Sequence, residues 1–216
     1  MLLIATLSAL AQSRDFTESL MQDTCTFEAK GRNPFFVLEP GYQLVLENKK
    51  GGQLVITVLN ETRKVGNLET RVVEENESEN GKTVEISRNF FAFCRETGGV
   101  YYFGEEVDIY KNGKIVKHEG AWLAEGANRP GLAMPGLALL GARYYQELAP
   151  GIAMDRAEIV SISEARQTPA GTFAKCLKTE ESSPLEPGTK EYKFYAPGIG
   201  LIQDEDLLLT KYGFVK

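Results

Sequence analysis

A strong β-hairpin signal in the middle of the chain constrains the fold more than any other sequence feature. Asn112-Gly113 stands between two stretches that alternate apolar and polar residues, 100–111 and 114–122. Both central positions of a type I′ turn need positive φ, which Asn and Gly adopt most easily. The chain is therefore expected to form an antiparallel sheet in which Lys111 pairs with Lys114.

This hairpin also predicts a position for the only His and the only Trp of the chain. Counting outward from the turn pairs Ile109 with Val116, Val107 with His118 and Phe103 with Trp122. Side chains alternate between the two faces of a strand. One apolar face is therefore expected to hold Tyr101, Phe103, Glu105, Val107, Ile109, Val116, His118 and Trp122.

Most of the remaining chain also has the pattern of β-strands. Strands bounded by turn residues are expected at 42–48, 53–60, 68–75, 82–93, 143–148, 155–167, 172–181, 191–195 and 201–211. Roughly ten strands without alternating helices predict a mainly β fold, an antiparallel meander that forms a barrel or half-barrel. A short N-terminal helix is expected at 13–22, where Phe16, Leu20 and Met21 have helical spacing.

The N-terminal residues have the composition of a secretory signal. Residues 1–11 are almost wholly apolar and end in Ala9-Leu10-Ala11, a small-x-small cleavage pattern. The run lacks a positive n-region, which suggests an atypical or truncated signal; a buried N-terminal strand or helix is the alternative. The expected organisation is a signal peptide at 1–11, a helix and lead-in at 12–32 and one β domain at 33–216. This predicts a secreted or periplasmic protein.

Three cysteines, Cys25, Cys94 and Cys176, have no CxxC or CxxxC spacing. In an oxidising compartment one pair could form a disulfide, and the sequence leaves the pairing open.

Composition and motifs argue against several classes of function. The net charge is −6 and no basic stripe is present, so no nucleic-acid partner is expected. There is no P-loop, dinucleotide fingerprint or G-x-S-x-G motif, and no metal-ligand spacing. We therefore expect no cofactor, no metal and no transmembrane segment. The acidic runs at 74–79 and 204–206 are interpreted as solvated turns.

His118 and Glu105 are the only candidates for catalysis. In the predicted hairpin they lie diagonally opposite on the apolar face, where a Glu–His pair could act as a general base. The alternative is that His118 is an ordinary core residue.

The same face provides the candidate lining of a ligand cavity. Aromatic residues occur largely as adjacent pairs, which gives one inner and one outer ring per pair. A Gly- and Pro-rich segment at 125–141 could form the rim. The candidate ligand-binding residues are Tyr101, Phe103, Val107, His118, Trp122 and Met134. An ordinary filled core is the alternative.

Three further segments resemble those of bacterial exported proteins of unknown function. They are Asn33-Pro34-Phe35-Phe36 with a following Pro40-Gly41, residues 168–173 (TPAGTF) with Cys176, and residues 195–201 (YAPGIGL) as a closing strand. Such proteins are similar in general shape to the LolA/LolB lipoprotein carriers. The resemblance implies a curved antiparallel sheet around an apolar cavity, and export; it brings no catalytic residues.

These observations lead to three functional hypotheses. The first is an exported non-enzymatic β protein that binds an apolar or amphipathic small molecule or lipid in its interior. The second is a hydrolase-like enzyme that uses a buried Glu–His pair. The third is a structural protein that binds an envelope partner through its outer aromatic residues.

Overall fold

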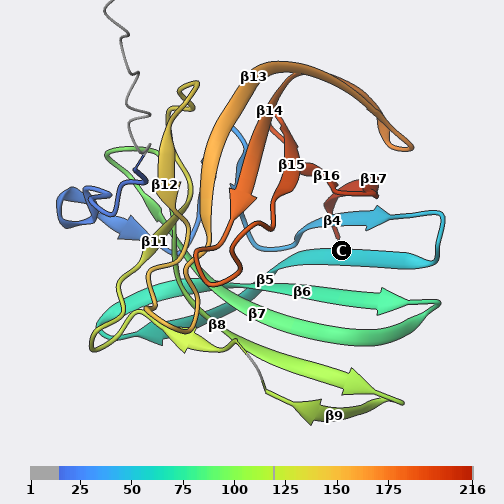
Figure 1. Ribbon diagram of the computed structural model, residues 1–216, viewed down its shortest axis with the longest axis horizontal. Helices are drawn as coiled ribbons and strands as arrows, with labels where there is room; N and C mark the ends of the chain where they lie inside the picture. The colour runs from blue at the N-terminus through green and yellow to red at the C-terminus, as the bar shows by residue number, and fades with distance from the viewer. Residues whose placement is uncertain (1–14, 119, 216) are drawn as a thin grey trace, which may run out of the picture.

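The computed structural model describes residues 15–118 and 120–215 (Figure 1). The expected signal peptide at 1–11 lies outside these residues. Fifteen strands form one antiparallel sheet, in the order β10-β8-β7-β6-β5-β4-β17-β16-β15-β14-β13-β12, with β1 beside β7 and both β9 and β11 beside β8. A separate two-stranded sheet consists of β2 and β3. The predicted mainly β, antiparallel meander is confirmed.

The strands are β1 (Phe27–Glu28), β2 (Gly31–Asn33), β3 (Phe36–Leu38), β4 (Tyr42–Glu47), β5 (Gly52–Val65), β6 (Leu68–Glu79), β7 (Lys82–Cys94), β8 (Val100–Lys111), β9 (Lys114–Lys117), β10 (Trp122–Leu123), β11 (Gly131–Met134), β12 (Arg143–Tyr145), β13 (Arg156–Thr168), β14 (Gly171–Ser182), β15 (Glu191–Ala196), β16 (Gly200–Asp204) and β17 (Leu207–Phe214). The single helical element is a 3₁₀ turn, η1 (Gln22–Thr24), so no helix in the described parts of the chain is long enough to cross a membrane.

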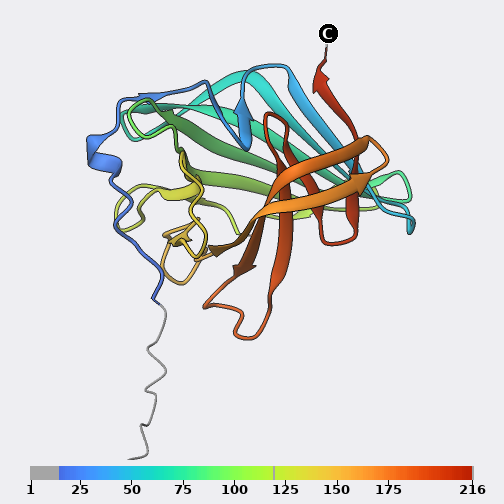
Figure 2. The same cartoon turned by 90° about the horizontal axis from the view of Figure 1, so that it is seen from above.

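The sheet is strongly curved but is not a closed barrel. In Figures 1 and 2, β5–β7 and β13–β14 run in very different directions, because the sheet twists along its length. Its two ends, β10 and β12, do not pair with each other. A single backbone bridge, between Arg129 and Leu148, connects segments that lie next to these two ends. One face of the sheet is therefore concave.

The expected N-terminal helix is absent from the described part of that segment. Thr17 instead forms a backbone bridge with Tyr144, and its N–H donates to the carbonyl of Arg143 at 3.1 Å. This bridge satisfies the backbone of Thr17 at the edge of the sheet, while Leu20 is buried in the core. Helical spacing of Phe16, Leu20 and Met21 was thus a misleading signal.

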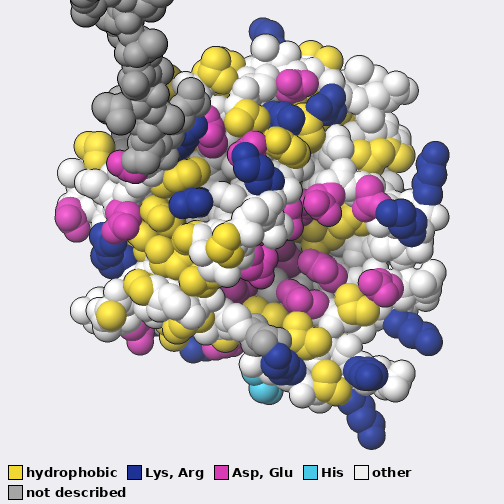
Figure 3. All heavy atoms as spheres, viewed as in Figure 1, with side chains coloured by type: hydrophobic (Ala, Val, Ile, Leu, Met, Phe, Trp, Pro, Cys, Tyr) yellow, Lys and Arg dark blue, Asp and Glu magenta, His cyan; other side chains and the backbone are white. Residues whose placement is uncertain are grey.

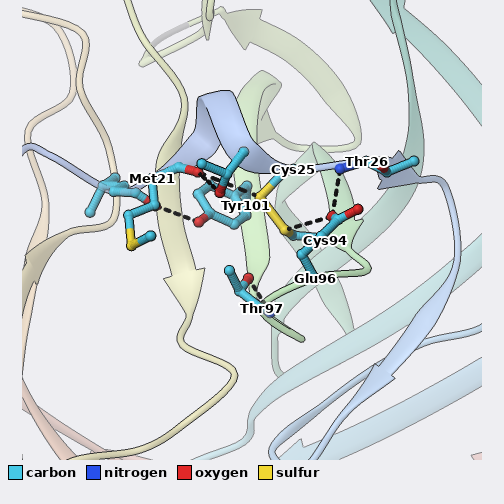
Figure 4. Close-up of a disulfide and its surroundings, with 10 residues drawn as sticks. Met21, Cys25, Thr26, Cys94, Glu96, Thr97 and Tyr101 are labelled. Carbon is cyan, nitrogen blue, oxygen red and sulfur yellow. Dashed lines mark hydrogen bonds between the residues drawn. A yellow bond between two sulfur atoms is a disulfide. The ribbon is translucent and has the colours of Figure 1, made fainter.

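A disulfide between Cys25 and Cys94 fastens the N-terminal segment to the end of β7 (Figure 4). Beside it, the Tyr101 hydroxyl donates to the carbonyl of Leu20, and the N–H of Thr26 donates to Glu96 at 2.6 Å. Cys176 is a free, buried thiol in β14. The pairing that the sequence left open is therefore Cys25 with Cys94.

A bulge in β8 reverses the alternation that the sequence predicted for this strand. Asn89 pairs with Glu105 and Phe91 with Tyr102, so Phe103 and Gly104 together face one residue of β7. Gly104 has φ 126°, and a Cβ there would lie 2.1 Å from the carbonyl oxygen of Trp122, so only glycine fits. As a result, Glu105 shares a face with Tyr102 and not with Phe103.

The two strands of the hairpin also depart from their predicted pairing outside the turn. Asn112 and Gly113 have φ of 54° and 73°, and Lys111 pairs with Lys114, as expected. Val116 is then an extra residue on β9, so Ile109 pairs with Lys117. Trp122 pairs with Glu105, not with Phe103. The predicted pairing is wrong beyond the turn.

Candidate functional site

The concave face of the sheet contains a cavity of about 360 Å³. Figure 3 shows a hollow in this face, with Asp and Glu side chains around it and hydrophobic side chains beside it. Residues two apart on each strand point to the same side. Ile56 and Val58 on β5, and Val73 and Glu75 on β6, therefore all project into the cavity.

Much of the lining is apolar, and most of it comes from β3, β4, β5 and the turn between β15 and β16. We call this set the apolar lining: Phe35, Phe36, Val37, Tyr42, Leu44, Leu54, Ile56, Val58, Val73, Phe91, Ile199 and Leu201.

The Asn-Pro-Phe-Phe segment positions part of the apolar lining. Asn33 is 2% exposed, and its Nδ2 donates to the carbonyls of Gly98 at 2.8 Å and Pro135 at 2.9 Å. The N–H of Gly198 donates to the carbonyl of Pro34 at 2.7 Å. Two of the segments on which the family resemblance rests therefore meet at this end of the cavity.

The other distinctive part of the lining is acidic. It comes from β6, β7 and β8 and from the second half of the chain. We call this set the carboxyl lining: Glu75, Glu85, Glu105, Glu147, Asp155, Glu181 and Asp204.

Lys193 is the only Lys or Arg among the described residues that line the cavity. Its Nζ lies 3.1 Å from Oε2 of Glu181 and 3.7 Å from Oδ2 of Asp204. The charge of Glu181 raises the pKa of Lys193 well above its ordinary value, so the ammonium stays protonated. Lys193 thus contacts two carboxyls, and its single positive charge cannot balance the seven carboxyls of the lining.

Burial makes several carboxyls of this lining hard to ionise. Removal from water raises the pKa of Glu105 to about 8, with a further contribution from the charge of Glu147. Desolvation likewise raises the pKa of Glu75 to about 7. The pKa of Glu147 also rises to about 7, through desolvation and then the charge of Asp155. These three groups therefore change protonation state near neutral pH.

Three buried polar atoms at or near the cavity have no hydrogen-bond partner within the described chain. Oε1 of Gln146 is one, although the amide nitrogen of that side chain donates to Glu181 at 3.3 Å. Nε1 of Trp122 is another; the indole lies close enough to Glu147 to lower the pKa of that carboxyl, without hydrogen-bond geometry. The hydroxyl of Tyr144 is the third. Native proteins pair most buried polar atoms, so these three need an explanation.

The carboxyl lining does not converge on a point. Among residues 15–118 and 120–215, the only three metal-type ligands whose donor atoms lie within 4.8 Å of one another are Cys25, Cys94 and Glu96. The two cysteines form the disulfide. A metal ion needs several converging donors, which the cavity carboxyls do not supply.

Of the residues predicted from the sequence to form a site, Glu105 alone lines the cavity. His118 lies on the outside, with its side chain 72% exposed and its Nδ1 2.6 Å from Asp108. The Glu105–His118 pair is not formed, because the extra residue Val116 on β9 brings His118 beside Asp108 and away from the face that holds Glu105.

The other predicted lining residues are buried elsewhere. The rings of Tyr101 and Phe103 each lie 5.2 Å from that of Phe27, under the N-terminal segment. Trp122 is 4% exposed and packs edge-on against Tyr102, which does line the cavity. Val107 and Met134 are also buried and are not part of the lining.

Sequence reasoning missed Glu75 and Asp204 because it placed them in solvated turns. In the structure β6 continues to Glu79, and the chain turns at Asn80-Gly81. Asp204 ends β16. For Glu75 a usable signal was present: the alternation that places Val73 on the concave face places Glu75 there too.

Comparison of the chain with protein-family models, with curated proteins and with solved structures found no match. The functional interpretation therefore depends on the geometry of the cavity.

Proposed function

We propose that this is an exported, non-enzymatic protein that binds a small amphipathic molecule in the cavity on its concave face. In this proposal the curved, open sheet acts as a half-barrel, and its interior holds the ligand. The observation that carries the proposal is the lining itself, which combines the apolar lining with seven carboxyls around about 360 Å³. Ligand pockets of roughly 300–1,000 Å³ with a few placed polar groups are typical of small-molecule sites.

The apolar lining can supply useful binding energy. Burial of one methylene contributes about 0.8 kcal/mol, so a chain of six contributes about 5 kcal/mol before the loss of ligand freedom is subtracted. A lipid or short amphiphile is thus a better fit than a fully polar solute.

The position of His118 argues against the hydrolase-like alternative, since its imidazole lies outside the cavity beside Asp108. The disulfide between Cys25 and Cys94 supports export, because such bonds persist mainly in oxidising compartments. Secretion or a periplasmic location therefore belongs to the proposal.

An uncharged fluorescent probe, N-phenyl-1-naphthylamine, tests the proposal. Ala133 lines the cavity, and Ala133→Phe places a ring in it. Ala165 is exposed on β13 outside the cavity, so Ala165→Phe is a matched control. We expect the wild type and Ala165→Phe to bind the probe equally and Ala133→Phe to bind at least tenfold more weakly. Equal binding by all three proteins, or no binding by the wild type, would overturn the proposal.

A further inference from the structure

We infer that the molecule bound in the cavity is an amphiphilic amine, with its ammonium group among the carboxyls and its apolar body on the apolar lining. This inference rests on the proposed function and goes further, since it names the chemical class of the ligand.

The charges around the cavity are not balanced. Seven carboxyls and one lysine line the cavity, and Lys193 is already engaged with Glu181 and Asp204. The remaining carboxyls have no salt bridge to any described Lys, Arg or His: Glu75, Glu85, Glu105, Glu147 and Asp155. Buried charges are normally paired. Burial raises the pKa of each of these five carboxyls, and a cationic ligand would supply the partner that their ionised form lacks.

Hydrogen-bond donors and acceptors at the cavity are not balanced either. The Tyr195 hydroxyl and Lys193 both already interact with Glu181. Oε1 of Gln146, a buried acceptor in the lining, has no donor at all. The unpartnered donors beside the cavity are the indole N–H of Trp122 and the hydroxyl of Tyr144, against the oxygens of five carboxyls that have no salt bridge. An ammonium brings up to three donors and no acceptor, and is therefore the complementary group.

The arrangement of the carboxyls favours an organic amine over a metal ion. No three cavity carboxyls in the described chain bring oxygens within 4.8 Å of one another, so they do not supply the converging charged ligands that a metal ion needs. An ammonium needs only one carboxylate as counter-charge and can donate its other hydrogens to neutral acceptors such as Oε1 of Gln146. The same cavity has a large apolar lining, which a bare metal ion would leave in contact with water. A molecule that has both an ammonium group and an apolar body interacts with the carboxyl lining and with the apolar lining.

A series of ligands with one chain and three head groups tests the inference: octylamine, 1-octanol and octanoate. Calorimetric titrations at a pH of about 8.5 keep the amine protonated, since alkyl amines like that of Lys titrate near 10.4. We expect octylamine to bind at least tenfold more tightly than 1-octanol, and octanoate to bind most weakly. Equal or tighter binding of 1-octanol or octanoate would overturn the inference and leave the proposed function standing. If none of the three binds, the proposed function fails as well.

A charge-neutral variant then locates the ammonium. Glu105→Gln keeps the shape of the side chain, and we expect it to weaken octylamine at least fivefold and leave 1-octanol unchanged. Glu79→Gln, at an exposed position outside the cavity, is the control and should change neither affinity. If Glu105→Gln does not fold, Glu147→Gln tests the same expectation at a second carboxyl. If octylamine binds both folded variants as tightly as the wild type, the inference is wrong.

Proton release gives an independent readout. An ammonium stabilises the charged form of nearby carboxyls, so binding should expel protons and strengthen as pH rises from about 6 to 9. The groups that act on Glu105 come from several elements: Tyr102 on β8, Glu75 on β6, Glu85 on β7 and Glu147 after β12. Titrations in two buffers with different ionisation enthalpies measure the release, and a value of zero throughout this pH range would contradict the inference.

Discussion

Glu105 matters for both the structure and the chemistry of the cavity. The bulge at Gly104 turns its carboxyl toward the concave face, and desolvation raises its pKa to about 8 from an ordinary 4.5. Between these two pH values the folded protein binds more protons than the unfolded chain. The contribution of Glu105 to stability is therefore greatest below pH 4.5 and is lost as the pH rises toward 8.

Glu105→Gln should remove this pH dependence, because the amide cannot ionise. We expect its melting temperature to equal that of the wild type at pH 5 and to exceed it at pH 9 by about 4 °C, or roughly 1–2 kcal/mol for a chain of this size. Thermal unfolding in the absence of ligand, followed by circular dichroism, checks this. A variant less stable than the wild type at pH 9 would show that the carboxylate is well solvated.

Gly104→Ala should be strongly destabilising. The new Cβ would lie 2.1 Å from the carbonyl oxygen of Trp122, at a φ that alanine rarely adopts. We expect a loss of at least about 3 kcal/mol in urea unfolding. Gly113→Ala is the control: it has φ 73° but open space around it, so a loss of about 1 kcal/mol is expected. Equal losses in both variants would rule out the tight bulge.

His118→Gln should have almost no effect on stability. The side chain is 72% exposed, and its pair with Asp108 lies at the surface, where such pairs contribute little. We expect a change within about 0.5 kcal/mol in urea unfolding. A loss above 2 kcal/mol would place His118 in the core, as the sequence had suggested.

At the scale of elements, local signals predicted the strands well. Asn112-Gly113 produced the expected turn, and the strands around it occur close to their predicted positions. The boundaries were less predictable: the segment predicted at 201–211 is two strands, β16 and β17, because the chain turns at Glu205 with φ 47°. An acidic turn and the acidic end of a strand have the same composition, so composition alone does not show where β16 ends.

The candidate site was only partly predictable because it depends on strand register. Glu105 lines the cavity, but the residues around it are not the ones that the predicted hairpin places there. One bulged residue exchanges the two faces of a strand, so Tyr102 took the position expected for Tyr101 or Phe103. A glycine inside a strand pattern often marks a bulge, so Gly104 was the sequence signal for this one.

The disulfide should stabilise the N-terminal segment and with it the whole domain. Cys25 and Cys94 are 69 residues apart, and closing a loop of that length contributes about 4 kcal/mol in the chain-entropy model. We expect reduction to lower the free energy of unfolding by about this amount. A Cys25→Ala/Cys94→Ala variant should have the reduced stability and no longer respond to reductant. Thiol counting on the denatured wild type should give one free thiol before reduction and three after it; three before reduction would contradict the bond.

At the scale of the whole molecule, the cavity results from pairings between distant parts of the sequence. β17 pairs with β4, which joins the second half of the chain to the first. No local pattern specifies this pair, nor the twist that makes one face concave. Lys193, Glu181 and Asp204 therefore meet Glu75 and Glu105 in a cavity that could not be assembled from the sequence alone.

The most direct test of the account is to locate the bound ligand. Methyl NMR spectra of the protein, recorded with octylamine and separately with 1-octanol, report on leucine and valine side chains throughout the fold. Leu44, Val58, Val73 and Leu201 line the cavity, whereas Leu137, Leu139 and Leu140 are exposed on one loop. We expect both ligands to shift the first set and to leave the second unchanged. Shifts confined to the exposed leucines, or none in the cavity, would contradict the assignment of the concave face as a binding site.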